Sequence, residues 1–465
     1  MRILFLQPTY FQDAQRTDVY NIVPPLGLGY LTGMARRAGH EARVFDIMGR
    51  DKDLPRVLSE FPPDLIGVTG MTSNYADMAA LCRRLRDELG YKGPLVAGGA
   101  HVTLEPKKSF EQCKLDACVL GEADDSFPEI LEVVAAGGEL GRIKGLYVGG
   151  AGYTGPRPSS VDLNRLVEPC YDAFELDRYV TNSVFVECAR GCPYACVYCS
   201  SKHLYGRSIR WMEPDRVIDT VERLGREFGF REFSPLADTF VADARWLDKF
   251  CTRLTERNLG MRYHCNGRIN LMTDRIFELL KSSGCYLVSY GVESAVGHVL
   301  SNIHKGYKVE QLEDVIRRTR AHGLACHLWF MLSLPGETEK DIDTTIRFAR
   351  RMKDLYQCSS EFQITRIYPG TPLAERAKLE IDDWTATREP NLPYPNVPAY
   401  YELDPELVYR KWRESCTSIR DTTIWENIRQ IPGLYAASRD KKLFLGQLVK
   451  RGARKIRNVV TGRIK

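Results

Sequence analysis

Short apolar runs alternate with amphipathic helical stretches along most of this 465-residue chain, and this alternation limits the fold more than any other feature. Between two such runs, for example, Met78, Leu81, Cys82 and Leu85 fall three and four residues apart, as on one face of a helix. Strands that are apolar throughout and are separated by helices predict parallel sheets that helices cover on both faces. We therefore expect an α/β fold.

The first series of alternating segments occupies residues 1–145. Its five predicted strands are Ile3 to Leu6, Ala42 to Phe45, Leu65 to Thr69, Leu95 to Ala97 and Ala117 to Leu120. The pattern predicts a doubly wound, Rossmann-like domain, which binds ligands in the loops at the carboxyl ends of its strands. The following residues, 146–182, are rich in glycine and proline and are predicted to form a linker with a small hairpin.

A second alternating series occupies residues 183–380. Its six predicted strands are Ser183 to Glu187, Glu232 to Leu236, Arg262 to Cys265, Tyr286 to Tyr290, Ala325 to Met331 and Glu361 to Arg366. Six strand–helix units predict a partial (β/α)6 barrel of the TIM type, with its working groups at the C-termini of the strands. We expect residues 381–465 to form a mainly helical C-terminal region that ends in a basic tail.

Charge is distributed unevenly along the chain. The net charge is +5, but residues 441–465 hold nine basic residues and no acidic one, so the rest of the chain carries a net charge of −4. The tail has the pattern of a basic amphipathic helix, which would bind an anionic membrane surface or an acidic redox partner. A solvated or frayed terminus is the alternative.

The roles expected for the cysteines depend on the cellular compartment of the protein. No stretch of about 18 apolar residues could cross a membrane, and the first residues lack a secretory segment, so we expect a cytoplasmic protein. Cytosolic thiols stay reduced unless they hold metal or do chemistry. The 14 cysteines therefore indicate metal binding first.

Three of the cysteines form a compact motif. Cys192, Cys196 and Cys199 follow the first predicted barrel strand with the spacing C-x3-C-x2-C. A loop of this length can place three thiolates at three corners of a four-iron four-sulfur (4Fe-4S) cluster and leave one iron open. A zinc site would need a fourth ligand, for which Cys188 and His203 are close in the sequence. The place of the motif at the mouth of a six-unit barrel favours the cluster.

In this position the motif resembles the cluster motif of radical S-adenosylmethionine (SAM) enzymes. With the preceding Rossmann-like domain, the chain is similar to the members of that family that carry an N-terminal cobalamin-binding domain, the class B methyltransferases. The resemblance implies that Cys192, Cys196 and Cys199 bind a 4Fe-4S cluster and that SAM chelates the open iron. The residues that it implies as SAM contacts flank the motif or end barrel strands: Tyr198, Asp238, Arg268, Gly291, Glu293 and Ser294.

Individual roles follow from the same resemblance. Glu293 would accept hydrogen bonds from the ribose hydroxyls of SAM, and the planar fork of Arg268 would pair with its carboxylate. Ala237 stands where the family usually has an acid before Asp238. This substitution weakens the assignment of Asp238 to the amino group of SAM.

The N-terminal resemblance consists of short motifs in the order expected for the cobalamin domain of the family, among them Pro24 to Leu31 and Gly98 to Thr103. It implies that cobalamin is bound by loops in which glycine lets the backbone approach a large ligand. The implied contacts are Thr69, Met71, Thr72, Ser73, Gly98, Gly99, His101, Gly121 and Glu122. The D-x-H-x-x-G sequence that places a histidine below cobalt in many cobalamin proteins is absent, and Asp46-Ile47-Met48-Gly49 stands in its place.

The resemblance also implies a reaction. An external one-electron donor of the flavodoxin or ferredoxin type would reduce the cluster, and cleavage of SAM would give a 5′-deoxyadenosyl radical. The expected outcome is cobalamin-dependent methylation of an unactivated carbon, or of a phosphinate phosphorus, in a biosynthetic intermediate. Ring formation, rearrangement or deoxygenation, with or without cobalamin, is the alternative within the family.

Two further points concern partners. A noncatalytic protein that binds metal or nucleic acid is the alternative outside the family, and Arg268 and Glu293 in the correct strand order argue against it. The substrate would be a small molecule or a peptide. Side chains near the barrel mouth are candidates to contact it, with packing as the alternative role: Tyr263, His264, Tyr290, His327, Trp329 and Tyr368.

Overall fold

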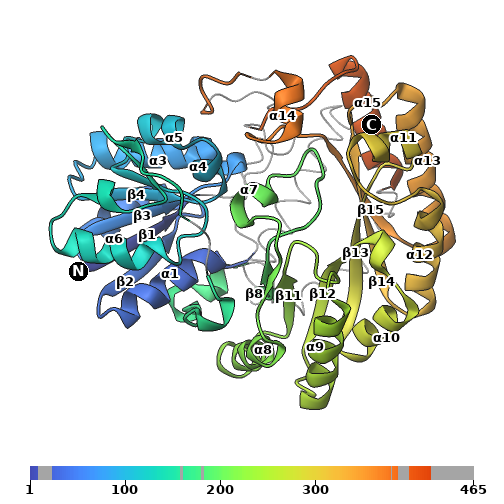
Figure 1. The fold of residues 1–465 in the computed structure, drawn as a ribbon, viewed down its shortest axis with the longest axis horizontal. Helices are drawn as coiled ribbons and strands as arrows, with labels where there is room; N and C mark the ends of the chain where they lie inside the picture. Colours follow the sequence, from blue (N-terminus) through green and yellow to red (C-terminus); the bar gives the residue numbers. More distant parts are fainter. Residues whose placement is uncertain (9–22, 158–160, 180–182, 379, 386–396, 420–465) are drawn as a thin grey trace, which may run out of the picture.

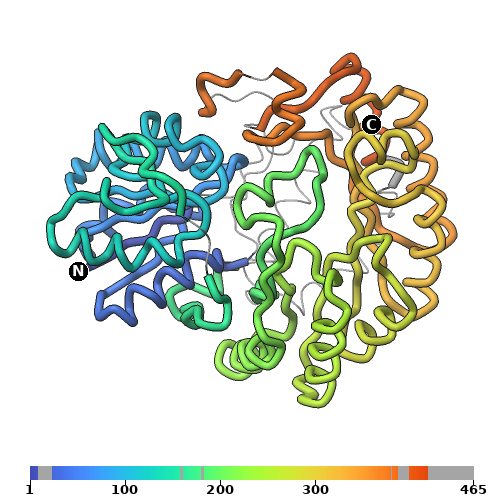
Figure 2. The backbone as a smooth tube through the Cα atoms, in the orientation of Figure 1, coloured from blue at the N-terminus to red at the C-terminus, as the bar shows by residue number. Residues whose placement is uncertain are grey.

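The structure is a computed structural model that describes residues 1–8, 23–157, 161–179, 183–378, 380–385 and 397–419. Two parallel sheets, each covered by helices, form two bodies that lie side by side (Figure 1). The first body is coloured blue to cyan and the second green to orange (Figure 2). The α/β architecture predicted from the alternation of segments is confirmed.

The first body contains a seven-stranded sheet in the order β2-β1-β3-β4-β5-β6-β7. Its strands are β1 (Arg2–Gln7), β2 (Glu41–Asp46), β3 (Leu65–Thr69), β4 (Leu95–Gly98), β5 (Ala117–Val119), β6 (Leu146–Val148) and β7 (Gly152–Tyr153). Its helices are α1 (Leu26–Arg37), α2 (Leu54–Glu60), α3 (Tyr75–Asp87), α4 (Ala100–Leu104), α5 (Pro106–Gln112) and α6 (Ser126–Ala135). The first five strands are parallel, whereas the antiparallel hairpin β6–β7 extends the sheet within the range expected to be linker.

The second body contains a six-stranded parallel sheet in the order β15-β14-β13-β12-β11-β8. Its strands are β8 (Ser183–Glu187), β11 (Glu232–Leu236), β12 (Arg262–Gly267), β13 (Cys285–Glu293), β14 (Ala325–Leu332) and β15 (Ser359–Ile364). Its helices are α8 (Pro214–Phe228), α9 (Ala244–Arg257), α10 (Asp274–Ser282), α11 (Gly297–Asn302), α12 (Glu310–Ala321), α13 (Glu339–Tyr356) and α14 (Pro372–Ala377). The strands follow one another along the sheet as a partial barrel requires.

Burial alternates along the barrel strands and distinguishes two faces of the sheet. On β14, Leu328 and Phe330 are buried beneath the helices, whereas His327 and Trp329 are only half-buried. The helices α9, α10, α12 and α13 lie on the outer side (Figure 1). Tyr263 and Tyr290 are fully buried on this outer side, so their predicted place near the substrate is corrected to core packing.

The C-terminal region joins the two bodies. Helix α15 (Pro405–Ile419) packs on the barrel, where the Trp412 indole donates a 2.9 Å hydrogen bond to the Phe362 carbonyl oxygen. Before it, Trp384 is buried in the core of the first body, and the Gln112 side chain donates to the Asp382 carbonyl oxygen at 2.9 Å. The basic tail, 441–465, lies outside the described residues. Within the described part of the chain, no helix has the length and apolar character needed to cross a membrane.

Candidate active site

The cluster loop, residues 191–200, joins β9 (Ala189–Arg190) to α7 (Ser201–Tyr205) and carries the three motif cysteines. β9 pairs antiparallel with β10 (Arg210–Trp211), so a short ribbon closes the base of the loop. Gly191 begins the loop with φ of +103°, and a Cβ there would collide with the Ser208 carbonyl oxygen. Only glycine is compatible with this turn, which leads the chain from the ribbon into Cys192.

The motif cysteines are half-buried, whereas nine of the other cysteines are buried. Cys192 Sγ lies 3.7 Å from Thr239 Oγ1, and Cys196 Sγ lies 4.0 Å from the His304 carbonyl oxygen. Among the described residues, no three His, Cys, Asp or Glu side chains converge as ligands of one metal ion. Cys188 is buried, and its thiol donates to the Val186 carbonyl oxygen at 3.5 Å.

These observations bear on which metal group the loop can hold. A zinc ion needs ligands that converge on one point, and none do so here. A 4Fe-4S cluster is a larger body whose three corners require thiols that are accessible and set apart from one another. The residues present therefore fit the cluster better than zinc.

A buried ion pair connects the cluster loop to the fourth barrel strand. Glu293 Oε1 accepts hydrogen bonds from Lys305 Nζ at 2.6 Å and from the Tyr198 hydroxyl at 2.9 Å. The side chains of Lys305 and Glu293 are only 8% and 9% exposed. A Cβ on Gly291 would crowd the Glu293 carboxylate, so glycine at this position leaves room for it. Glu293 and Tyr198, both expected at the SAM site, thus lie together. They share a partner, Lys305, that belongs to none of the sequence motifs.

Arg268 contacts the backbone of the same lysine, Lys305. It follows β12 and is 8% exposed. Its guanidinium lies 3.4 Å from the centroid of the Tyr194 ring, in the cluster loop, and donates to the Lys305 carbonyl oxygen. The buried Nε has no partner among the described residues. An orphaned guanidinium donor beside the cluster loop is suited to an anionic group such as a carboxylate.

Two other residues expected at the SAM site differ in their surroundings. Asp238, after β11, accepts a 2.6 Å hydrogen bond from the Ser201 hydroxyl at the start of α7, and burial raises the pKa of its carboxyl. Ser294 is fully buried, and its Oγ lies 3.2 Å from Thr345 Oγ1 and accepts from the Val296 amide. The Ser294 hydroxyl thus stabilises the turn after β13, and its contact with SAM stays a prediction.

The loops that follow β3, β4 and β5 lie at one edge of the first sheet, where doubly wound folds bind ligands. Gly99 has φ of +101°, and a Cβ there would lie 2.6 Å from the Gly70 carbonyl oxygen, so these loops pack backbone against backbone. Met71 exposes 40% of its surface, which leaves its thioether accessible. Other residues expected to contact cobalamin lie half-buried at the same edge: Thr69, Ser73, Gly98 and Gly121.

His101 and Thr72 face inward. The His101 ring is fully buried, with Nδ1 3.1 Å from Thr72 Oγ1 and ring contacts to Tyr75 at 4.0 Å and Trp384 at 4.9 Å. Burial lowers the pKa of His101 to about 3, so the ring is neutral at physiological pH. Both side chains pack within the first body, and their contacts with cobalamin stay predictions. Met48 is also buried, in the core at the end of the edge strand β2.

Glu122 belongs to a buried ion network between the two bodies. Its carboxylate accepts from Arg190 Nη1 at 2.8 Å and from Arg210 Nη2 at 2.7 Å, and its side chain is only 2% exposed. Arg190 also bonds Asp124 at 2.6 Å and Glu187 at 2.9 Å. Arg190 and Arg210 are register partners on the two strands of the ribbon that closes the cluster loop. The Glu122 carboxylate thus anchors that ribbon, and its contact with cobalamin stays a prediction.

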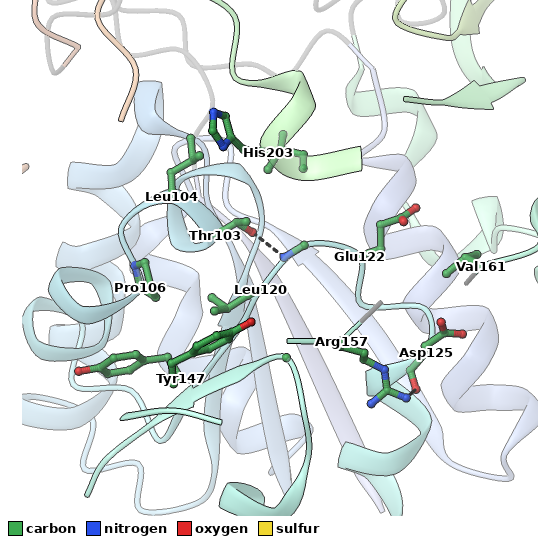
Figure 3. Close-up of a pocket in the computed structure, with 14 residues that line it drawn as sticks. Thr103, Leu104, Pro106, Leu120, Glu122, Asp125, Tyr147, Arg157, Val161 and His203 are labelled. Atoms are coloured by element: carbon green, nitrogen blue, oxygen red, sulfur yellow. Dashed lines mark hydrogen bonds between the residues drawn. The ribbon is translucent and has the colours of Figure 1, made fainter. Parts of the chain in front are cut away.

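A cavity of about 630 Å³ lies where the two bodies meet (Figure 3). Thr103 and Leu104 of α4 line it, with Gly121 of the loop after β5. His203 and Leu204 of α7, the helix that directly follows the cluster loop, line it from the barrel side. The loop after β5 and helix α4 therefore face α7, the helix that directly follows the segment expected to hold the cluster.

The residues that sequence reasoning missed share one property: each acts through a partner distant in the chain. Lys305 pairs with Glu293 across the end of β13, Arg190 reaches Glu122 in the other body, and Trp384 covers His101. No spacing rule links such pairs. The only local signal is the place of Arg190 directly before the cluster motif.

Comparisons with known proteins agree with this domain order. Residues 14–131 match the family described as B12 binding domain, and residues 186–349 match the radical SAM superfamily. An uncharacterized methyltransferase of Pyrococcus horikoshii is 31% identical over 385 residues, which cover 81% of this chain and 82% of that protein. The cytidylyl-2-hydroxyethylphosphonate methyltransferase of Streptomyces wedmorensis is 24% identical, over 75% of this chain and 77% of that protein.

Solved structures share the fold. The radical SAM methyltransferase TsrM of Kitasatospora setae, whose structure holds cobalamin and a 4Fe-4S cluster, superposes with a TM-score of 0.67 at 18% identity, over 81% of this chain and 78% of that chain. The cobalamin-dependent radical SAM enzyme OxsB superposes with a TM-score of 0.70 at 14% identity, over 97% of this chain and 71% of that chain.

The two domains define a radical SAM enzyme with a B12-binding domain. The chain belongs to the cobalamin-dependent radical SAM methyltransferase family. Its cofactors are accordingly a 4Fe-4S cluster, SAM and cobalamin.

Proposed function

We propose that this enzyme methylates an unactivated carbon, or a phosphinate phosphorus, in a small biosynthetic intermediate. The observation that carries the proposal is the cavity bordered by α7 from the barrel and by α4 and the loop after β5 from the first body. Methyl transfer from cobalamin to a substrate radical requires that the two cofactor sites open toward each other. This arrangement supports that requirement.

The roles proposed for the residues follow from their surroundings. Cys192, Cys196 and Cys199 would hold the cluster, and the remaining iron would bind SAM. Glu293, oriented by Lys305, would accept hydrogen bonds from the ribose hydroxyls, while Arg268 would bind the carboxylate of SAM. When bound, the cluster and SAM supply one-electron cleavage of SAM, and cobalamin supplies a transferable methyl group.

Asp238, Tyr198 and Gly291 complete the proposed SAM site. Asp238 is held toward the cluster loop by Ser201, and Tyr198 holds the Glu293 carboxylate in place. On the cobalamin side, contacts are proposed for the edge residues Thr69, Met71, Ser73, Gly98, Gly99 and Gly121. Electrons would come from an external donor of the flavodoxin or ferredoxin type.

The test uses protein reconstituted anaerobically with iron, sulfide and hydroxocobalamin. It should hold about four irons per chain and retain about one cobalamin, and SAM with a deuterated methyl group should label the product of a candidate biosynthetic intermediate. The variant Cys192→Ala should lose iron, whereas Cys188→Ala, at a buried thiol outside the loop, should keep it. If the folded protein excludes cobalamin or leaves products unlabelled, ring formation, rearrangement or deoxygenation replaces methylation.

A further inference from the structure

An aromatic side chain and a free carboxylate lie next to each other on the inner face of the barrel sheet. Trp329 on β14 and Glu361 on β15 are register partners in a parallel pair, so their Cα atoms lie about 5 Å apart. Trp329 is half-buried and Glu361 is exposed. Among the described residues, the Glu361 carboxylate has no hydrogen-bond or ion-pair partner, so it is available to a ligand on this face of the edge strand β15.

Three cations near this face are assigned to other partners, Arg268 among them to the carboxylate of SAM. Arg262, at the opposite end of the barrel, pairs with Glu232. Lys305 pairs with Glu293, and Arg268 stacks on Tyr194 in the proposed SAM site. A phosphate or carboxylate placed beside Glu361 would therefore meet a like charge, and its desolvation would be uncompensated.

The neighbouring polar group on this face carries no charge. His327 lies two residues before Trp329 on β14, and the two ring centroids are 4.6 Å apart. Its Nδ1 lies 2.8 Å from Ser359 Oγ, and its Nε2 is buried without a partner. Burial lowers the pKa of His327, so at neutral pH the ring offers a hydrogen bond and no positive charge.

We propose that this face binds a substrate in which a protonated amine, or another organic cation, is attached to a flat apolar group. The cation would lie between the Glu361 carboxylate and the face of the Trp329 ring, and the apolar part would cover the indole. The inference rests on the proposed function and narrows it, because it favours carbon over phosphorus as the methyl acceptor. It also separates this chain from its Streptomyces relative, whose name specifies a cytidylyl phosphonate.

Two probes of matched size and opposite charge test the proposal: phenethylamine and 3-phenylpropionate. Binding of each to the anaerobically reconstituted full chain is measured by saturation-transfer NMR at low salt, without turnover. The amine should bind about tenfold more tightly or better, as expected for one charge-assisted contact. Glu361→Gln should abolish this preference, and Trp329→Leu should weaken binding of the amine.

Glu310→Gln is the matched control, because Glu310 is an exposed carboxylate without a partner at the start of α12, outside the barrel. It should keep the preference for the amine. Equal binding of the two probes, tighter binding of the acid, or a preference that survives Glu361→Gln would overturn the proposal. Since the NMR measurement needs no methylation, a chain that fails to bind cobalamin would refute the proposed function and leave this result interpretable.

Discussion

Replacing Glu122 by glutamine should loosen the junction between the two bodies. This one carboxylate accepts from Arg190 at 2.8 Å and from Arg210 at 2.7 Å, on the two strands that close the cluster loop. Glutamine keeps the shape of the side chain but removes the charge and one acceptor. Both guanidiniums then lose an anionic partner in a region where the Glu122 side chain is 2% exposed.

The magnitude follows from burial. Removing one partner of a fully buried ion pair costs about 3–5 kcal/mol when the remaining charge is left uncompensated. The cost at Glu122 should lie below this range, because Arg190 keeps Asp124 and Glu187 and the Arg210 side chain is 22% exposed. The pair Arg157–Glu129 has a similar length, 2.6 Å, but Glu129 is 47% exposed, and such pairs contribute only about 0–1 kcal/mol. Glu129→Gln is therefore a control with the same chemical change and a different environment.

The assay compares the two variants with the parent protein under anaerobic conditions. Glu122→Gln should lower the midpoint of denaturant unfolding clearly more than Glu129→Gln, and should release cobalamin on desalting. A double-mutant cycle with Arg210→Met should show that the two changes are coupled, since they remove the same contact. Equal effects of Glu122→Gln and Glu129→Gln, or additive effects in the cycle, would refute the anchoring role.

Three further predictions concern other parts of the chain. Glu293→Gln should weaken SAM binding by about 1.5–3 kcal/mol, measured by equilibrium dialysis. Unchanged binding would contradict the ribose role. The double variant Glu293→Gln, Lys305→Met is the control, because it removes the lysine charge that the single variant leaves unpaired. Burial raises the pKa of Glu337, in the loop after β14, to about 8, so the native state holds a proton that the unfolded chain loses near pH ~4.3. Stability should therefore fall as pH rises from about 5 to 8, and Glu337→Gln should flatten this dependence in unfolding experiments; an unchanged slope would contradict the assignment. Deletion of residues 441–465 should leave iron content and SAM cleavage intact but reduce binding to anionic liposomes or a flavodoxin-like donor. The effect should be measured at low salt, because exposed charges are screened over ~10 Å at 0.1 M salt. Loss of the cluster on deletion would instead indicate a tail packed on the barrel.

The sequence predicted those strands and helices whose apolar residues recur at a regular spacing. All six barrel strands lie within a few residues of their predicted bounds, because each combines an apolar outer face with helices of clear amphipathic spacing. The sequence predicts a small hairpin in the linker, where β6 and β7 lie, but it does not predict that this hairpin extends the first sheet. Strands of three and two residues are too short to display an alternation, and their pairing with β5 depends on tertiary contact.

Within the candidate site, the sequence predicted chain positions better than side-chain directions. The glycine-rich loops after β3, β4 and β5 lie at one edge of the sheet, as parallel topology requires. His101 turns inward because Trp384, far along the chain, packs against it. Ser294 turns inward because Thr345 of α13 offers a partner. Neither partner can be identified from local spacing.

At Glu122, the position of the loop and the role of the side chain are two separate matters. The loop after β5 does border the cavity between the bodies, but its carboxylate is occupied by two arginines. What the loop still offers to a large ligand is its backbone and the bare Cα of Gly121, where an added Cβ would meet nothing closer than the Leu204 carbonyl oxygen at 3.9 Å. Gly121 thus allows a ligand to approach the backbone closely, and the next residue, Glu122, anchors the ribbon at the base of the cluster loop. The buried ion network thus links the loop after β5 to the ribbon that closes the cluster loop.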